Sequence, residues 1–275
     1  MEVMSLAERQ GVLAIAFDGV QYFDKLSNHN CMPDIDSLME WLGQASYNEV
    51  VYEEYEKTVA HLSKLFGDQS LRAIVMKDYG CSLNYPKPNH RPCGDIDIYV
   101  ANHKGKHDRV LVDFANQILV NAGAEDISHG NEHHSVLSFE GHTIENHWSI
   151  LDINTHKSSR YLDGLLEKLA GEPHSEKEVN GTIVCLPSVR FNSIHLLRHM
   201  ANDFATVKTT LRHVLDWSTF VVNNQVDWDY VHEVAHKSNM NRFLDAINEI
   251  CVEYLGYPKE MFPVEEADVK LRDRV

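Results

Sequence analysis

A six-residue stretch at 95–100, Asp-Ile-Asp-Ile-Tyr-Val, constrains the fold more than any other part of the chain. Its strict alternation predicts a β-strand with one apolar face. Residues i and i+2 of a strand place their side chains on the same face, with Cα atoms about 6.6 Å apart at a rise of about 3.3 Å per residue. The carboxylates of Asp95 and Asp97 would repel each other there unless a cation lay between them, and hard ions such as Mg²⁺ prefer oxygen ligands of this kind. For an isolated pair, a solvent-facing strand edge guarded by acids remains the alternative.

Hydrophobic patterning on either side of this strand predicts an α+β protein with a small mixed sheet and flanking helices. Residues 5–66 are largely helical in pattern, and the apolar run at 71–76 suits a buried strand. The dipeptide Glu140-Gly141 is typical of a hairpin turn between strands at 135–139 and 143–150. The polar, turn-rich stretch at 171–180 indicates a boundary. The remaining expectations are a loop at 28–33, helices at 35–42, 47–65, 106–122, 161–170, 188–202, 206–223, 228–238 and 242–254, and N-caps at Ser188 and Asp227.

This pattern divides the chain into three expected parts. They are an N-terminal helical segment at 1–66, a core with the sheet at 67–180 and a C-terminal helical region at 181–275. A chain of 275 residues is long enough for one large domain or two modest ones.

Composition excludes several classes of function. The formal net charge of −16 argues against a protein that grips long nucleic acid through its overall field. No stretch approaches the run of about 20 apolar residues that a membrane span needs, and the amphipathic N-terminus is unlike a signal peptide. We therefore expect a cytoplasmic protein. The absence of C-x-x-C spacing favours reduced thiols over a disulfide framework or a zinc cage for the five cysteines, Cys31, Cys81, Cys93, Cys185 and Cys251.

The glycine- and proline-punctuated segment before the acidic strand resembles the active-site signature of the polymerase-β-type nucleotidyltransferase superfamily. More narrowly, the chain resembles a bacterial family usually described as uncharacterised nucleotidyltransferases, whose pattern runs Lys-Gly, Tyr-Pro, Arg and then Gly-Asp-Ile-Asp. Stretches at 143–148, 195–199, 211–217 and 226–228 resemble the later strand and the helical portion of that family, so the likeness covers most of the chain. The residues that match the signature are Lys77, Tyr85, Pro86, Arg91, Gly94, Asp95, Ile96 and Asp97.

The resemblance implies a metal-dependent enzyme that moves a nucleoside monophosphate from a nucleoside triphosphate to a hydroxyl or amine acceptor. It implies that Asp95, Asp97 and Glu145 hold Mg²⁺ or Mn²⁺ and carry the chemistry. The acceptor, whether a small molecule, a sugar or a protein, is not identified by the sequence. The residues implied near the nucleotide are Lys77, a point charge for phosphate, Arg91, a bidentate fork, and the turn residues Gly80, Cys81 and Ser82.

Alternatives remain open for these residues. Asp78 stands where the family has glycine, and an acid at that turn would repel a triphosphate. A catalytically degenerate member that binds a nucleotide or a partner protein is therefore a rival. Arg91 can instead pair with a nearby acid and stabilise the loop. Glu145 can be a surface residue of the hairpin, as most charged residues are.

The histidines suggest an alternative interpretation of the function. His195 and His199 are four residues apart and so share a helix face that can hold zinc, which would suit a metal-dependent phosphohydrolase. No glutamate follows the first histidine, so the metalloprotease motif is missing. The adjacent His133 and His134 form no recognisable motif. Packed or hydrogen-bonded roles are the more common ones for such imidazoles.

Overall fold

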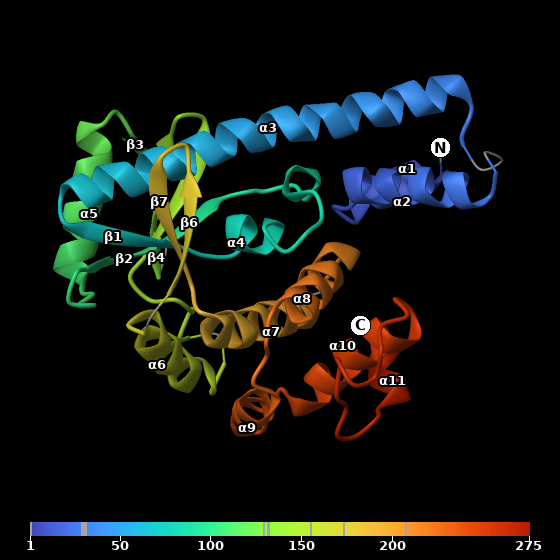
Figure 1. Ribbon diagram of the computed structural model, residues 1–275. Coiled ribbons are helices and arrows are strands. Elements are labelled where there is room, and N and C mark those ends of the chain that lie inside the picture. The colour runs from blue at the N-terminus through green and yellow to red at the C-terminus, as the bar shows by residue number, and fades with distance from the viewer. Residues whose placement is uncertain are drawn as a thin grey trace.

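The computed structural model describes residues 2–28, 32–128, 130, 133–154, 156–172, 174–206 and 208–275. It confirms the α+β class, because helices cover both faces of a mixed β-sheet (Figure 1). A long N-terminal helix runs across one face, and the C-terminal helices gather below the other. Cys31 and part of the loop predicted at 28–33 lie outside the described residues.

The described strands form one seven-stranded sheet, and they are β1 (Leu71–Val75), β2 (Ile96–Asn102), β3 (Glu125–Asp126), β4 (His134–Phe139), β5 (His142–His147), β6 (Ser175–Val179) and β7 (Thr182–Leu186). Their order is β3-β4-β5-β2-β1-β7-β6. β2 pairs antiparallel with β1 and parallel with β5. The hairpin predicted between β4 and β5 is confirmed, with φ values of 50° at Glu140 and 81° at Gly141. Positive φ at both central residues is the geometry that matches strand twist in a two-residue turn.

The helices largely follow the predicted ranges, with end points that differ by a few residues. None of the described helices combines the length and apolarity needed to cross a bilayer. Their bounds are α1 (Glu2–Arg9), α2 (Leu13–Leu26), α3 (Ile35–Asp68), α4 (Asp78–Ser82), the 3₁₀ helix η1 (Pro88–His90), α5 (Arg109–Asn121), α6 (Ser159–Ala170), α7 (Val189–Ala205), α8 (Leu211–Asn223), α9 (Trp228–Ser238), α10 (Asn241–Glu253) and α11 (Val269–Arg272).

Helix α3 joins two helices that the sequence predicts separately into one element of 34 residues. Gly43 lies inside it, although glycine costs about 1 kcal/mol in a helix interior. Burial of Trp41 and Ala45 against Phe17 of α2 offsets that cost, and the indole Nε1 of Trp41 donates to the Leu13 carbonyl at 2.8 Å. One end of α3 therefore packs on α1 and α2 while the other end lies on the sheet (Figure 1).

The two faces of the sheet have different partners, and the alternation in β2 decides which side chain meets which partner. Ile96, Ile98 and Val100 pack in the apolar cluster beneath α3 and α5. Tyr99 belongs to the second cluster, formed with the C-terminal helices. Because alternate residues of a strand share a face, Asp97 points with Tyr99 toward the C-terminal side.

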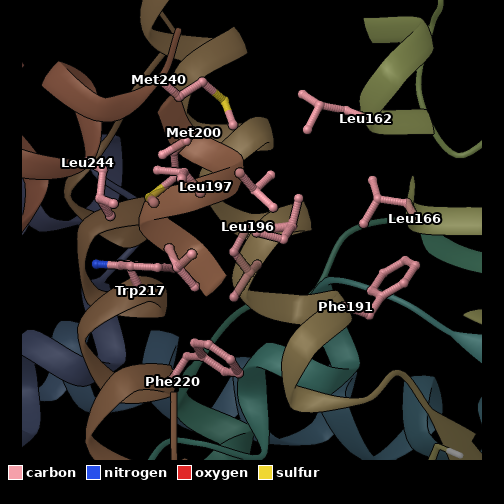
Figure 2. Packing of buried hydrophobic residues seen from close by; sticks show 14 of the residues in the cluster. Leu162, Leu166, Phe191, Leu196, Leu197, Met200, Trp217, Phe220, Met240 and Leu244 are labelled. Atoms are coloured by element: carbon pink, nitrogen blue, oxygen red, sulfur yellow. The ribbon is translucent and has the colours of Figure 1, made fainter. Parts of the chain in front are cut away.

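The C-terminal helices share an apolar core with the adjoining face of the sheet, and Trp217 is fully buried in it (Figure 2). Its Nε1 donates to Asn248 Oδ1 at 3.0 Å, so the one polar atom of the ring is satisfied. The N-caps predicted at Ser188 and Asp227 are confirmed, since each side chain accepts the N–H three residues on. This core fixes α7 and α8 beneath the acidic strand.

The stretch at 171–180 differs from its prediction as a turn-rich boundary, because it contains β6. That strand reads Ser-Glu-Lys-Glu-Val and exposes four of its five side chains, so it lacks the apolar pattern that would reveal a strand. It pairs with β7, which joins the sheet parallel to β1. The division predicted at residue 180 falls on the Asn180-Gly181 turn of this hairpin and stays a prediction.

Candidate active site

The register between β2 and β5 places three carboxylates at one end of the sheet. Asp97 lies opposite Glu145 across the two parallel strands. Asp95 directly precedes β2 and is exposed, whereas Asp97 is 4% exposed and Glu145 is half-buried. Partial burial and the charges of Glu145 and Asp97 raise the pKa of Asp95. The strand register therefore brings Asp97 and Glu145 together, and Asp95 lies two residues before Asp97 at the same end of the sheet. We refer to this end of β2 and β5 as the acidic edge.

Asp97 already has two nitrogen partners in this site. The Lys77 ammonium lies 2.7 Å from Asp97 Oδ1, and the imidazole Nε2 of His147 lies 2.9 Å from the same oxygen. Burial alone would raise the pKa of Asp97, but these two neighbours hold it well below its usual range. Burial would also lower the pKa of Lys77, but the Asp97 carboxylate raises it to about 12. Asp97 is thus a carboxylate and Lys77 a cation at neutral pH.

Lys77 occupies a strained position between β1 and α4. Its backbone has φ 45° and ψ −118°, which is rare for any residue except glycine. The next contact along the chain, Met76 N–H to the Asp97 carbonyl at 2.9 Å, extends the pairing of β1 and β2 up to this residue. The strain turns the lysine side chain back over β2 and onto Asp97.

Two histidines also line the site, His147 on β5 and His134 on β4. His147 Nε2 is 3.5 Å from Glu145 Oε2, and His134 Nε2 is 3.4 Å from Glu145 Oε1. His134 is opposite His147 in the β4–β5 register. Counting outward from the Glu140-Gly141 turn places these two residues together, so the predicted hairpin contained the signal. The site is therefore lined by imidazole as well as by carboxylate.

The turn residues predicted near the nucleotide are mostly enclosed. Cys81 is 5% exposed and Ser82 is fully buried. The Ser82 hydroxyl is held between Tyr52 and the Tyr79 carbonyl at 2.9 and 2.7 Å. Gly80 is partly exposed on the same short helix. The predicted phosphate contacts at these positions stay predictions, and the Ser82 side chain already has structural partners.

One face of α3 holds the whole segment between β1 and β2 in place. Tyr52 reaches Ser82, and Tyr55 donates to the Asp95 carbonyl at 3.0 Å. These residues are three apart and therefore lie on the same side of the helix. The same stripe makes further contacts between Glu56 and Tyr79, Asn48 and the Asn89 carbonyl, and Glu49 and His90.

Arg91 lies buried between two acids, with 2% of its surface exposed. Its Nη1 is 2.7 Å from Asp78 Oδ1, and its Nε and Nη2 make a bidentate contact with Asp216 of α8 at 3.1 and 2.7 Å. Tyr85 donates to the same Asp216 carboxylate at 2.8 Å, and Asp78 accepts the Gly94 N–H. Burial would raise the pKa of Asp78, but the Arg91 charge keeps it lowered. This placement favours the structural role for Arg91 and shows Asp78 neutralised by an internal partner.

A cavity of about 130 Å³ adjoins the carboxylates on the side of α7. Lys77 and His147 form its wall toward Asp97, and His195, Arg198 and Asn202 of α7 line it from below. His195 is 2% exposed, and its Nδ1 has no hydrogen-bond partner within the described chain. A partly open space beside the acids, lined by both polar and apolar side chains, can receive a second reactant.

His199, Asp203 and His213 form a separate cluster between α7 and α8. The Nε2 atoms of His199 and His213 lie 3.5 and 3.2 Å from Asp203 Oδ2. Nδ1 of His213 accepts the Thr210 N–H at 3.0 Å, so the proton of the neutral ring is on Nε2. That nitrogen donates to Asp203 and has no lone pair for a metal. His195 belongs to no candidate ligand group of the described chain, so the predicted pair of His195 and His199 is not brought together with a third ligand.

The buried state of His195 predicts how stability depends on pH. Burial, together with the charge of Lys77, lowers the pKa of His195 well below 6.5. The unfolded chain takes up a proton near pH 6.5 and the folded chain does not. The free energy of unfolding therefore falls as the pH drops below that value, by at most about 1.4 kcal/mol per pH unit from this group.

Urea unfolding at pH 6.5 and 5.5 checks this expectation. His195→Gln should lose about 1 kcal/mol less than the wild-type protein over that interval. An equal loss in the two proteins would show that His195 is protonated in the folded state.

The donor set at the acidic edge fits a divalent cation. Asp97, Glu145 and His147 each offer one ligand atom, and those atoms lie within 4.8 Å of one another. Asp95 belongs to none of the candidate ligand groups of the described chain, although the charges of Glu145 and Asp97 act on its carboxylate. Hard cations take few carboxylates from the protein and leave positions for substrate phosphates, which suits this partly open edge.

A known protein family matches most of the chain. A family model described as "Uncharacterised nucleotidyltransferase" matches residues 1–256. Among solved structures, an antigenic nucleotidyltransferase-like protein from Paracoccidioides brasiliensis matches with 14% sequence identity and a TM-score of 0.43. That match covers 68% of this chain and 89% of the other. No curated protein sequence matches the chain.

Proposed function

Because this chain belongs to the family of uncharacterised nucleotidyltransferases, we propose that it transfers a nucleoside monophosphate from a nucleoside triphosphate to a hydroxyl or amine acceptor. The observation that carries the proposal is the strand register that sets Asp97 beside Glu145, with Asp95 two residues away on the same edge. Carboxylates brought together in this way repel one another, and a cation relieves the repulsion.

Asp95, Asp97 and Glu145 would hold Mg²⁺ or Mn²⁺. A divalent cation held there supplies charge neutralisation for the phosphates as negative charge develops in the transition state. Lys77 and His147 both contact Oδ1 of Asp97, and no hydrogen bond to Oδ2 is found within the described residues. One oxygen of this carboxylate therefore remains available to a cation.

The chain's own side chains would position the two reactants. Lys77 is 21% exposed at its side chain and can contact a phosphate oxygen while still facing Asp97. The acceptor enters the cavity above α7, and its oxygen or nitrogen bonds to the α-phosphorus. The bond from that phosphorus to the bridging oxygen breaks, pyrophosphate leaves, and Glu145 takes the proton of the acceptor. Most of the rate enhancement then comes from positioning and charge, as in phosphoryl transfer generally.

This function is tested by measuring the transfer of label from nucleoside triphosphates with and without a metal chelator. Cell extract supplies the acceptor, and each of the four nucleoside triphosphates carries label on the α- or on the γ-phosphate. We expect label from the α-phosphate alone to enter a product, EDTA to abolish the transfer, and excess Mg²⁺ or Mn²⁺ to restore it. Transfer that continues unchanged in EDTA, or that uses the γ-label, would contradict the proposed reaction.

A second candidate is a degenerate member that binds a nucleotide without turning it over. The observation that favours it is the occupation of Asp97 Oδ1 by Lys77 and His147, which neutralises this carboxylate internally. Calorimetric titration with ATP, GTP, CTP and UTP, each with Mg²⁺, separates the candidates. Binding of one nucleotide with no label transfer in any extract would favour the degenerate member.

A further inference from the structure

The imidazole of His147 faces two carboxylates at once. Its Nε2 is 2.9 Å from Asp97 Oδ1 and 3.5 Å from Glu145 Oε2. Its Nδ1 is 3.3 Å from the Ser149 carbonyl oxygen, to which only a protonated nitrogen can donate. A neutral ring with the proton on Nδ1 has a lone pair on Nε2. That lone pair is directed at the two carboxylates, so the three groups can hold a cation between them.

Burial keeps this ring in its orientation. His147 is 1% exposed, and the Ser149 carbonyl holds its far nitrogen. Histidines that bind metals usually donate their second N–H to a carbonyl or carboxylate in this manner, which fixes both the tautomer and the direction of the lone pair. The contact with Ser149 is thus an observation independent of the acids, and it points to a ligand on the opposite side of the ring.

A second imidazole supports the carboxylate beside it. His134 is 8% exposed, its Nε2 is 3.4 Å from Glu145 Oε1, and its Nδ1 has no partner in the described chain. The rings of His134 and His147 have centroids 4.9 Å apart. Imidazole nitrogens therefore line one side of the acidic edge, whereas a centre that binds Mg²⁺ alone needs only oxygens and water.

We propose that His147 is a metal ligand together with Asp97 and Glu145, and that this mixed nitrogen and oxygen centre binds a transition-metal ion such as Mn²⁺ in preference to Mg²⁺. The inference rests on the proposed function and specifies its metal. Imidazole suits the first-row transition metals, carboxylate suits Mg²⁺ and Mn²⁺, and Mn²⁺ accepts both kinds of donor. His134 contacts Oε1 of Glu145, the oxygen that does not face His147, and orients this carboxylate. The competing arrangement is an imidazolium ring, in which a proton takes the place of the metal.

Pulsed electron paramagnetic resonance on the Mn²⁺-loaded protein distinguishes these arrangements without using activity. We expect modulation from a directly bound ¹⁴N in the wild-type protein, and its replacement by the ¹⁵N pattern when histidine alone is ¹⁵N-labelled. Titration of the free Mn²⁺ signal should show that Mg²⁺ displaces Mn²⁺ only when present at more than about 10-fold excess. The nitrogen signal is read from the wild-type chain, so the result does not depend on whether any variant folds.

Two substitutions on the same strand sharpen the test. His147→Gln should weaken Mn²⁺ binding by about 10- to 100-fold and remove the nitrogen modulation from any Mn²⁺ still bound. His142→Gln is the matched control, because His142 lies on β5 with its ring against Tyr55 and outside the candidate ligand groups of the described chain. It should leave both signals unchanged.

The outcomes separate this inference from the proposed function. Bound Mn²⁺ without nitrogen modulation in the wild-type protein overturns the role of His147 and leaves a carboxylate metal site intact. Failure of both Mn²⁺ and Mg²⁺ to bind, with and without a nucleoside triphosphate, overturns the inference and the metal-dependent function together. Nitrogen modulation that survives in His147→Gln assigns the ligand to another histidine and also overturns the proposal.

Discussion

Replacing Arg91 with methionine should lower the free energy of unfolding by about 3–5 kcal/mol. Arg91 is the shared partner of Asp78 and Asp216, and all three side chains are largely buried. Removing the guanidinium leaves two carboxylates without their counter-charge in a low-dielectric setting, which costs far more than the intact pair contributes. Urea denaturation followed by circular dichroism gives the change directly.

The matched control for this substitution is an exposed ion pair of the same kind. Arg190 contacts Asp227 at 2.9 Å with about half of each side chain exposed. Arg190→Met should therefore change stability by less than about 1 kcal/mol. Arg91→Lys, which keeps the charge but loses the fork, should fall between the two. A stable Arg91→Met protein that needs more triphosphate for transfer would instead assign Arg91 to phosphate binding.

Asp97→Asn should reduce transfer of the α-label by at least about 100-fold. Asparagine keeps the size of the side chain and removes the charge that a cation requires and that the Lys77 ammonium faces. The assay is incorporation of label into cell extract by equal amounts of folded protein. Asp126→Asn, on the exposed edge strand β3, is the control and should keep the wild-type rate.

The double substitution Asp95→Asn/Asp97→Asn sets the limit of this prediction. The side chains at positions 95 and 97 are then both uncharged, so transfer should fall to the background of the extract. Equal label transfer by the double variant and the wild-type protein would refute the proposed metal role of the two aspartates.

Local pattern was sufficient to predict the elements that carry the acids. The alternation at 95–100 predicted β2, and the Glu140-Gly141 dipeptide predicted the β4–β5 hairpin, because both signals are contained in a few neighbouring residues. The polar edge strand β6 shows why others were missed, since its pairing with β7 supplies hydrogen bonds that require no apolar side chains. Strand propensity reflects the packing of a side chain, and an exposed edge has little of it.

Long-range partners account for most of what the sequence did not reveal at the site. Arg91 and Asp216 are 125 residues apart, and no periodicity connects a loop arginine to an acid on a late helix. The concern that Asp78 repels a triphosphate came from its position beside the turn alone. In the folded chain its carboxylate faces Arg91 and the Gly94 N–H, so its charge is compensated by partners that local pattern could not supply.

Helix α3 fixes how α1 and α2 are rotated about its axis relative to the acidic edge. At 34 residues it is about 50 Å long, and each successive side chain points about 100° further around the helix axis. Its outer half docks α1 and α2, and its inner half holds the Asp95 carbonyl through Tyr55. Inserting a single residue between these halves would rotate one attachment away from the other without breaking the helix. The length and rotation of α3 thus couple the positions of α1 and α2 to the position of Asp95.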